Sequence, residues 1–576
     1  MLTLDIDQDS DAFRCLTKGV EDRVRAQGLI LKVAPEATFR VEAGALLIQQ
    51  SVAMAIRARD NHKHFSWTDD AARFIDTLAR SYAVVNRAQK RLSAIQMPGC
   101  ADAILKDYPL TSNLDPHQRI AVAAMVDDLI YGLCLFDEQG SGKTVMAIHA
   151  FDYLKNKGAV DAMIVLAPKN MLNEWQKDFQ RFMKDRYRVT VVAGSRTRKY
   201  LSLIDPSNVY VTNYETAHLL EGTLRSLASR FAGRVVLTVD ESFFVKNRET
   251  KRGAAVRKLR RLCDRCWVLC GTPAPNNALD VVHQFDVADG GVTFSGVTLP
   301  DDPELLRAVV QQTVEKRGLY LRRLKHDILP DLPGKKFEQV AVPMEEEQEN
   351  LYVSALKGLA RDVEATTDVG FKSTITSFMA RRMALFQLCS NPGQIVPSYA
   401  GDPGKLSALD RLLEEIVTRK KEKVVIWSFF RYSLDQIVKR YAKYHPVRVD
   451  GTVTNTESRS KAVTDFQDDD ETMLFVANPA AAGAGITLTR SRIAIYESFS
   501  IQAAHYLQSI DRIHRRGQTR AVTYYMLICK NSIEEQEYKR LLQKEEAARQ
   551  LFSDDDPRPT TREVFLEELV SAIKLL

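Results

Sequence analysis

Short apolar runs alternate with amphipathic stretches from residue 109 onward, and the runs fall into two series. A nearly continuous apolar run predicts a strand of a parallel sheet, because helices cover both faces of such a sheet. The runs are 133–136, 163–166, 209–212, 235–239 and 266–270 in the first series, and 424–427, 447–449, 473–476, 493–496 and 522–528 in the second. We therefore expect an α/β chain with two lobes of similar build.

The first 108 residues follow a different pattern. Apolar residues alternate with polar ones in 2–6 and in 29–33, which predicts short strands and hairpins, and the pattern becomes helical around 50–95. No catalytic set of residues is visible here. We expect a small α+β accessory domain that guides the substrate.

Two further segments are predicted to be helical. Apolar side chains recur at helical spacing in 356–363 and in 379–386, so a helical insertion and a connector at 321–336 are expected to separate the lobes. The tail from residue 533 is helical in pattern and highly charged. The predicted domains are 1–108 (accessory), 109–290 (first lobe), 291–405 (insertion and connector), 406–540 (second lobe) and 541–576 (helical brace).

Composition narrows the class of protein. Of 576 residues, 45% are hydrophobic and 27% are charged, as in ordinary globular proteins, and the net charge of +6 is compatible with a polyanionic partner. No apolar run approaches the ~20 residues of a membrane span, and the acidic start lacks a secretory pattern, so we expect a cytoplasmic protein without a membrane partner. Cys263, Cys266 and Cys270 have no second Cys/His pair at zinc-finger spacing, so we expect thiols rather than zinc ligands.

A glycine-rich octapeptide, DEQGSGKT, follows the run 133–136 and precedes a helical pattern. Strand, glycine turn, Gly-Lys-Thr and helix form a phosphate-binding loop, in which backbone N–H groups point at the phosphates of a nucleotide. Lys143 is expected to reach the β- and γ-phosphates of ATP, and Thr144 to hold Mg²⁺. Asp137 stands where the strict pattern has glycine. The residues predicted to bind ATP here are Asp137, Glu138, Gln139, Gly140, Ser141, Gly142, Lys143 and Thr144.

Two adjacent carboxylates, Asp240 and Glu241, follow the run 235–239 in the same lobe. At the carboxyl end of a strand, Asp240 can hold Mg²⁺ through water, and Glu241 can orient and deprotonate the attacking water. Asp240 is therefore a predicted metal and ATP ligand, and Glu241 a predicted catalytic residue.

Arg512 and Arg515 lie three residues apart in the segment 508–518, so a helix there would present both on one face. Two guanidinium groups directed at a γ-phosphate would act as arginine fingers, and such a residue is worth ~10³–10⁵ in rate. The alternative is a basic surface helix. If the two are arginine fingers, ATP binds between the lobes and its hydrolysis opens and closes them, as in a motor.

Taken in order over about 110–540, these segments resemble the motifs of superfamily-two helicases, and among them those of the Swi/Snf-type double-stranded DNA translocases. Leu114–Gln118 resembles the adenine-sensing Q motif, and Asp137 matches this family's motif I. The other similar segments are 165–170 with Trp175 (motif Ia), 212–215 (Ib), 240–247 (II), 270–276 (III), 321–327 with 332–335 (the inter-lobe connector), 425–428 (IV), 482–489 (V) and 508–518 (VI). Within the family the chain looks closest to compact HARP-type annealing helicases and to solitary bacterial or phage members.

The resemblance implies a fold and further site residues. The lobes would be RecA-like, Gln118 would contact the adenine, and Gln508 would join the ATP-binding residues. The candidate DNA-binding residues are Lys169, Asn170, Asn213, Lys246, Asn247, Ser428 and Thr487. Short polar side chains and loop N–H groups contact phosphates without reading bases, so DNA binding is expected to be largely sequence-independent and to fall steeply with salt.

The expected function is an ATP- and Mg²⁺-dependent motor that translocates on double-stranded DNA and remodels it or displaces proteins bound to it. We expect a nucleoid-associated protein encoded by a bacterium or a phage. The family usually has His at the fourth position of motif II, where this chain has Phe243. Because Phe cannot form that hydrogen bond, the DNA control of hydrolysis is in question. A strand-separating DNA or RNA helicase and an ATP-gated DNA-binding clamp with weak turnover are the alternatives.

Overall fold

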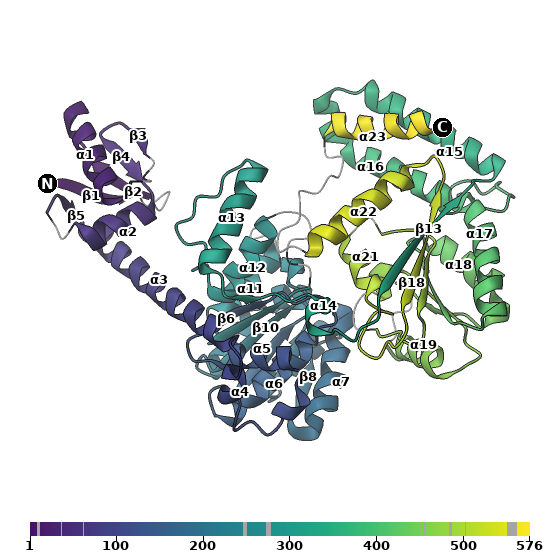
Figure 1. Cartoon of the computed structure of the whole chain (residues 1–576), viewed down its shortest axis with the longest axis horizontal. Coiled ribbons are helices and arrows are strands. Elements are labelled where there is room, and N and C mark those ends of the chain that lie inside the picture. Colours follow the sequence, from purple (N-terminus) through teal and green to yellow (C-terminus); the bar gives the residue numbers. More distant parts are fainter. Residues whose placement is uncertain are drawn as a thin grey trace.

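The computed structural model describes residues 1–7, 12–35, 37, 39–60, 63–245, 250–271, 273, 278–452, 456–482, 486–500, 503–549 and 561–576. The strands of these residues form sheets of five, seven and six strands. Figure 1 shows two α/β lobes, which hold the larger sheets, and a small N-terminal domain that a long helix joins to the first lobe. The prediction of two parallel-sheet lobes with a small α+β domain is confirmed.

The first lobe has a seven-stranded parallel sheet in the order β12-β6-β11-β10-β7-β9-β8. Its strands are β6 (Gly132–Leu135), β7 (Ala162–Leu166), β8 (Val189–Val191), β9 (Val209–Thr212), β10 (Val235–Asp240), β11 (Arg265–Leu269) and β12 (Tyr320–Leu321). The structure confirms the five predicted strands to within one residue at each end. It adds β8 and β12, which are too short to give an apolar run.

Successive residues of a strand point to opposite faces of the sheet, so an apolar run presents apolar side chains on both faces. Helices cover both faces of this sheet. In β6, Leu133 and Leu135 are part of the core that includes α5 (Pro116–Val126) and α6 (Lys143–Asn156). Cys134 belongs to a second core on the other face, with α12 (Leu279–Asp289). This burial on both faces explains why the strands read as continuous apolar runs.

The second lobe has a six-stranded parallel sheet in the order β13-β18-β17-β14-β16-β15. Its strands are β13 (Lys335–Val342), β14 (Val424–Trp427), β15 (Val447–Val449), β16 (Leu474–Ala477), β17 (Ile493–Tyr496) and β18 (Val522–Cys529). The five predicted strands are confirmed. β13 is additional, and as a half-exposed edge strand it carries no apolar run. Since β12 and β13 flank the connector, each lobe receives one edge strand from it.

The N-terminal domain has a five-stranded sheet in the order β3-β4-β2-β1-β5. Its elements are β1 (Leu2–Asp7), β2 (Ala12–Leu16), α1 (Val20–Val33), β3 (Arg40–Glu42), β4 (Ala45–Ile48), α2 (Gln50–Arg59) and β5 (Phe65–Trp67). The predicted strand at 29–33 is wrong, because these residues end α1. A five-residue alternation is too short to separate the two periods. The long helix α3 (Asp69–Ile95) reaches the first lobe, where Arg91 Nε lies 2.7 Å from Asp127 Oδ2.

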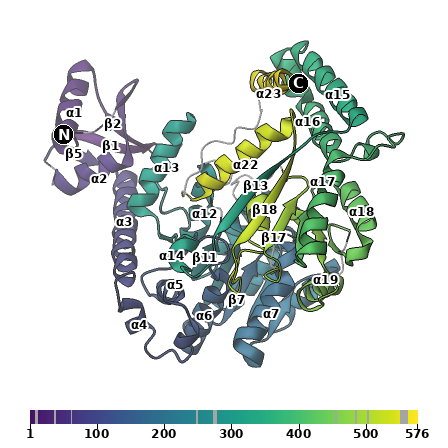
Figure 2. The same cartoon turned by 45° about the vertical axis from the view of Figure 1, so that its right-hand side comes forward.

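The predicted helical insertion, 291–405, is divided between the lobes. Its helix α13 (Pro303–Arg317) joins the core of the first lobe, whereas α15 (Glu346–Glu364) and α16 (Asp368–Ser390) lie at the end of the second lobe with α22 (Ile533–Arg549) and α23 (Arg562–Leu575), as Figure 2 shows. Arg382 of α16 is 2% exposed and forms ion pairs with Glu537 and Glu568. The C-terminal helices thereby brace the insertion. Among the described residues, no helix combines the length and the apolar character that crossing a membrane requires.

Candidate nucleotide site between the lobes

The phosphate-binding loop turns directly from β6 into α6. Gly140 and Gly142 have φ values of 83° and 88°, a backbone conformation that favours glycine. A Cβ on Gly142 would collide with the side chain of Gln118. Lys143 is the first residue of α6, and its Nζ donates to the carbonyl oxygen of Asp137 at 2.7 Å. Thr144 follows and is half-buried. The loop therefore has the tight turn that a phosphate cradle requires.

The Q-motif residues are tied to this loop. Gln118 is 5% exposed, and its Nε2 donates to the carbonyl oxygen of Ser141 at 3.4 Å, while its Oε1 accepts from the backbone N of Asp115 at 3.0 Å. His117 Nε2 lies 2.9 Å from the same carbonyl oxygen, and burial lowers the pKa of this imidazole. Both side chains thus support the loop that was expected to hold the phosphates.

The two acidic residues of the loop bind the connector. Asp137 is completely buried and forms an ion pair with Arg323, which also donates to the carbonyl oxygen of His117. Glu138 Oε2 accepts from the backbone N of Lys325 at 2.8 Å. Both carboxylates are therefore occupied by connector groups, and their predicted contact with ATP would be indirect. Sequence reasoning assigned no role to Arg323 or Lys325, although both lie in the connector motif.

Asp240 and Glu241 meet the loop at the carboxyl end of β10. Asp240 Oδ2 accepts from Trp175 Nε1 at 2.9 Å, and burial together with the Glu241 charge raises the pKa of Asp240 to about 7. Glu241 has a φ of 51°, and its Oε1 accepts from Gln139 Nε2 at 2.8 Å. Among the residues that the structure describes, neither Glu241 Oε2 nor the buried Ser141 Oγ has a hydrogen-bond partner. Two unpartnered buried oxygens among these carboxylates fit a site for a nucleotide and Mg²⁺.

The two arginines come from the second lobe but do not lie on a helix. The helix α21 (Ala503–Ile510) ends before them, so the predicted helical spacing of Arg512 and Arg515 is wrong as a local structure. Their side chains nevertheless converge, since both guanidinium groups donate to the carbonyl oxygen of Ile486, at 3.3 and 3.4 Å. The convergence arises from a turn that folds back against 486–488, which spacing along the chain does not reveal.

Arg512 is deeply buried for a cation, and Arg515 is half-buried. Arg512 is 2% exposed, and burial, reinforced by the Arg515 charge, lowers its pKa to about 9. Its Nε donates to the carbonyl oxygen of Gln508 at 2.8 Å, and the Gln508 side chain is buried beside it. The Glu241 carboxylate acts on both arginines in the opposite direction, raising the pKa. Two neighbouring guanidinium groups next to a carboxylate, one buried and one half-buried, are suited to bind an anion of high charge.

The two halves of the site meet across the lobes. A Cβ built on Gly140 would lie 3.9 Å from Arg515 Cγ, so this arginine stands against the phosphate-binding loop. Lys325 Nζ of the connector lies 2.6 Å from Asp511 Oδ1, directly before Arg512. The loop, the acidic pair and the arginines are therefore parts of one site.

A cavity of about 290 Å³ opens beside this site, at the N-terminus of α5. Its walls come from the Q motif, the connector and the segment after the arginines. They comprise Asp115, Pro116, Ile328, Leu329, Pro330, Asp331, Leu332, Arg516, Gly517 and Gln518.

The candidate DNA-binding residues have different surroundings. Lys169 is exposed and Asn170 half-buried, both on a short turn of helix before α7 (Leu172–Met183). Asn213 caps α9 (Tyr214–Leu219), with its Oδ1 accepting from the backbone N of Thr216 at 2.8 Å. Lys246 and Asn247 lie outside the described residues.

Two candidates from the second lobe are engaged inside the protein. Ser428 is fully buried and donates to Glu497 Oε2 at 2.7 Å, so its side chain is not available to a DNA phosphate. Thr487 Oγ1 accepts from Arg515 at 3.0 Å and therefore holds an arginine of the nucleotide site.

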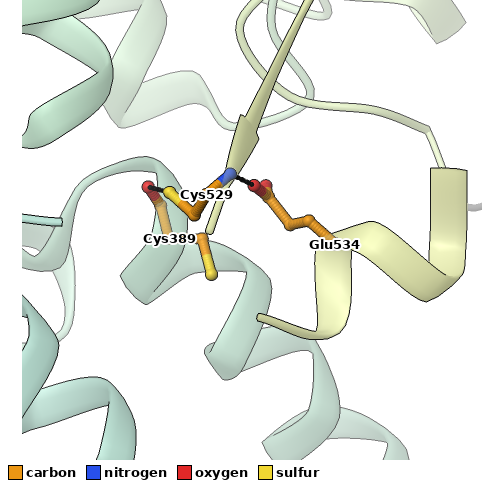
Figure 3. Close-up of side chains that lie close together, drawn as sticks. All are labelled: Cys389, Cys529 and Glu534. Carbon is orange, nitrogen blue, oxygen red and sulfur yellow. Dashed lines mark hydrogen bonds between the residues drawn. The ribbon is translucent and has the colours of Figure 1, made fainter. Parts of the chain in front are cut away.

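A separate cluster in the second lobe could be mistaken for a metal site. Figure 3 shows Cys389, Cys529 and Glu534, whose ligand atoms all lie within 4.8 Å of one another. Glu534 Oε1 already accepts from Lys405 Nζ at 2.6 Å, and its Oε2 accepts from the backbone N of Cys529 at 2.9 Å. Burial raises the pKa of the Cys389 thiol. With the carboxylate occupied and a buried ammonium beside it, this cluster fits a structural role. Cys263 and Cys266, at the start of β11, are likewise buried thiols in the core of the first lobe.

Comparisons with known proteins find two matching domain families in this chain. Residues 117–394 match the SNF2-related domain, and residues 404–517 match the helicase conserved C-terminal domain. YwqA of Bacillus subtilis is 27% identical over 426 residues, which cover 70% of this chain and 45% of YwqA. The ISWI chromatin-remodeling complex ATPase CHR17 of Arabidopsis thaliana is 26% identical over 477 residues, which cover 78% of this chain and 42% of that protein.

A solved structure is also similar. The Sulfolobus solfataricus SWI2/SNF2 ATPase core in complex with dsDNA is 23% identical, and the alignment covers 81% of this chain and 97% of that chain, with a TM-score of 0.35. That score is too low to relate the arrangement of the lobes in the two structures. The fold and the matched domains therefore define the class: this chain contains the two-domain core of an SNF2-type ATPase. It spans less than half the length of the curated relatives named above.

Proposed function

We propose that this protein hydrolyses ATP between its two lobes and uses the resulting motion to translocate on double-stranded DNA. The observation that carries the proposal is the position of Arg515, which comes from the second lobe and stands against Gly140 of the phosphate-binding loop. A site divided in this way links the state of the nucleotide to the separation of the lobes.

Each residue of the site has a role in this proposal. Lys143 binds the β- and γ-phosphates, and Glu241 orients the attacking water and accepts its proton. Arg512 and Arg515 stabilise the negative charge that develops on the transferred phosphoryl group. Thr144 and Asp240 would hold Mg²⁺, which when bound neutralises phosphate charge.

The cavity of about 290 Å³ is proposed to receive the adenine, because its walls come from both lobes and from the connector. Gln118 links the Asp115 backbone to the loop, since its side chain accepts from Asp115 N and donates to the carbonyl oxygen of Ser141. In this arrangement the adenine would contact both lobes, which are proposed to move relative to each other. Gln508 would contribute indirectly, through its backbone carbonyl oxygen, which accepts from Arg512.

Double-stranded DNA is proposed as the partner, held mainly through its backbone. Lys169 and Asn170 are accessible for phosphate contacts in the first lobe, and Lys246 and Asn247 stay candidates from the sequence. Asn213 would support the DNA-binding surface by capping α9. Thr487 would connect that surface to the nucleotide site, since it accepts a hydrogen bond from Arg515. Such contacts carry no base information, so binding would be sequence-independent and sensitive to salt.

The decisive experiment measures ATP turnover with and without blunt linear duplex, and displacement of a third strand from a triplex. Turnover that rises with blunt duplex, together with ATP-dependent triplex displacement, is the expected result. Glu241→Gln serves as the inactive control. Efficient unwinding of a tailed duplex, without stimulation by blunt duplex, would favour a strand-separating helicase and overturn the translocase.

One observation favours a second candidate, an ATP-gated DNA clamp. Phe243, at the motif II position where the family usually has His, stacks on Phe244 with ring centroids 4.5 Å apart, and Phe244 in turn stacks on Tyr214. The rings of Phe243 and Phe244 have no polar group and cannot relay a hydrogen bond between DNA and the acidic pair, although Tyr214 Oη donates to the carbonyl oxygen of Asp240. If turnover does not exceed that of the Glu241→Gln control while ATP still changes DNA affinity, the clamp is the better description.

The finer family placement is also a proposal. Similarity to YwqA of Bacillus subtilis supports a bacterial or phage origin, and a DNA substrate would imply association with the nucleoid. Proteins bound to DNA are further candidate partners, since a translocating motor displaces them. The HARP-type resemblance rests on the sequence motifs alone.

A further inference from the structure

A groove lies on the first lobe beside β8, the edge strand of the sheet. The phosphate-binding loop starts from β6, near the other edge of that sheet. The groove has a volume of about 420 Å³, within the ~300–1,000 Å³ typical of ligand pockets. One wall is α8 (Arg196–Ile204), which follows the edge strand β8, and the other is the junction of α9 with α10 (Glu221–Arg230). The lining residues are Arg196, Thr197, Tyr200, Leu219, Leu220, Gly222 and Thr223.

The rim of this groove is unusually apolar. Tyr200, Leu201 and Ile204 of α8 are 48%, 58% and 46% exposed, and Leu219 on the opposite wall is 49% exposed. With Thr197 the α8 residues recur at i, i+3, i+4 and i+7, the spacing by which a helix normally turns one face toward a core. Here that face points to solvent, and Leu203 is the buried side chain of α8. A clustered exposed apolar surface of this kind marks an interaction site.

Positive charge lies at one end of the apolar rim, at the start of α8. Arg196, Arg198 and Lys199 lie in the first turn of α8, which has no acidic residue. Cations at this end of a helix oppose the helix dipole, so helix stability does not explain them. Within the part of the chain that the structure describes, no ion pair involves these three residues. By contrast, Lys258 near the other wall pairs with Glu221 at 3.1 Å.

We propose that this groove docks an acidic peptide segment of a partner protein, which inserts apolar side chains between Tyr200 and Leu219 and places carboxylates beside Arg196 and Lys199. Both features of the surface select this occupant. A DNA backbone would satisfy the cations but leave the apolar side chains without contacts. An uncharged apolar peptide would leave the cations unused. Laying the apolar face of a helix into such a groove is a common mode of peptide recognition.

The test uses the full chain and a labelled 20-residue synthetic peptide with Leu at i, i+3, i+4 and i+7 and Glu elsewhere. Fluorescence anisotropy measures its affinity, and hydrogen exchange locates the bound peptide. The controls are a scrambled peptide of equal composition and a peptide with Lys in place of Glu. We expect the Glu/Leu peptide to bind at least about tenfold more tightly than either control, a difference of ~1.4 kcal/mol. We also expect it to slow exchange in 196–204 and 219–223.

Two double variants examine the two features separately. Ile204→Ser/Leu219→Ser removes exposed apolar groups, and Arg196→Glu/Lys199→Glu reverses the charge; each should weaken peptide binding at least about tenfold, while basal ATP turnover stays unchanged. Leu305→Ser and Lys357→Glu/Lys372→Glu are matched controls at exposed positions elsewhere. Equal binding of the scrambled peptide, or affinity unchanged in both double variants, would overturn the proposal. Loss of duplex binding without any peptide binding would assign the cations to DNA and overturn it as well.

Discussion

Lys325 of the connector forms a buried ion pair with Asp511, with Nζ and Oδ1 2.6 Å apart and side chains 4% and 9% exposed. The same Nζ donates to the carbonyl oxygen of His514 at 3.3 Å. A Cβ on Gly140 would lie 3.2 Å from Lys325 Cε, so the lysine also packs on the phosphate-binding loop. Burial lowers the pKa of Lys325 to about 8, against the opposing effect of Asp511. This one side chain therefore joins the connector, the loop and the arginine segment.

We predict that Lys325→Met lowers ATP turnover at least about tenfold, because the buried Asp511 loses its closest partner and keeps only Lys335, at 3.7 Å. Breaking a buried ion pair costs ~3–5 kcal/mol, and Lys335 should reduce that cost. Adding Asp511→Leu should restore part of the loss. A double-mutant cycle on kcat and on thermal unfolding measures the coupling. Lys336→Met, which breaks an exposed pair with Glu338, is the control and should change little. Additive effects of the two single variants would mean that the pair does not couple the lobes.

Arg515 is predicted to act on the transition state rather than on ATP binding. Arg515→Lys keeps the charge but loses the planar group that donates to Thr487 and faces the loop, and kcat should fall about 10³-fold with little change in ATP affinity. Single-turnover hydrolysis and binding of a fluorescent ATP analogue separate the two quantities. Arg490→Ala is the control, since that side chain is 55% exposed and pairs with the exposed Asp470 away from the site. If the Arg515 variant instead loses affinity at unchanged kcat, the finger assignment is wrong.

The sequence predicted both sheets well because parallel strands buried on two faces give unambiguous apolar runs. It also selected residues that the structure brings together in one candidate site, since Lys143, Asp240 and Arg515 lie in local patterns. It missed the role of Arg323 and Lys325, because their partners are far away in the sequence. Asp137 lies 186 residues before Arg323, and Asp511 lies 186 residues after Lys325. It misjudged Ser428, because the carboxylate that buries it, Glu497, follows a different strand. Contacts that depend only on tertiary packing produce no periodic pattern in the sequence.

Trp175 is predicted to be a positioning residue for Asp240. Trp175→Phe removes the 2.9 Å hydrogen bond to Oδ2 but keeps most of the packing. A hydrogen bond to a charged group is worth ~1.5–3 kcal/mol, so kcat/KM should fall about 10- to 100-fold and more Mg²⁺ should be needed for half-maximal turnover. A purely structural role would lower stability without shifting the Mg²⁺ dependence.

The chain offers a matched control for that experiment. Trp267 is 1% exposed in the same lobe, and no residue in the described part of the chain forms a hydrogen bond with its Nε1. Trp267→Phe should therefore leave the Mg²⁺ dependence unchanged. Similar shifts in both variants would attribute the effect to packing.

Phe243→His tests whether this position uncouples hydrolysis from DNA. Histidine can hydrogen-bond where Phe243 only stacks on Phe244, so the fraction of ATP turnover that depends on duplex DNA should increase. The ratio of turnover with saturating duplex to turnover without DNA is the quantity to compare. Phe243→Tyr, which keeps the ring, controls for aromatic stacking. An unchanged ratio in the histidine variant would show that the position is neutral in this protein.

His149 makes the first lobe sensitive to acid. Its ring is 1% exposed, Nδ1 lies 2.9 Å from Tyr108 Oη, and burial lowers its pKa to about 4, below the ~6.5 of an unfolded chain. The unfolded state therefore binds the proton first, so the stability is complete above pH 6.5 and is lost progressively as the pH falls toward 4. At pH 5 the expected loss from this residue is about 2 kcal/mol. His149→Gln should remove that part of the loss in urea unfolding compared at pH 7 and pH 5, whereas the exposed His218→Gln should not. Equal losses in the wild type and in His149→Gln would contradict the assignment.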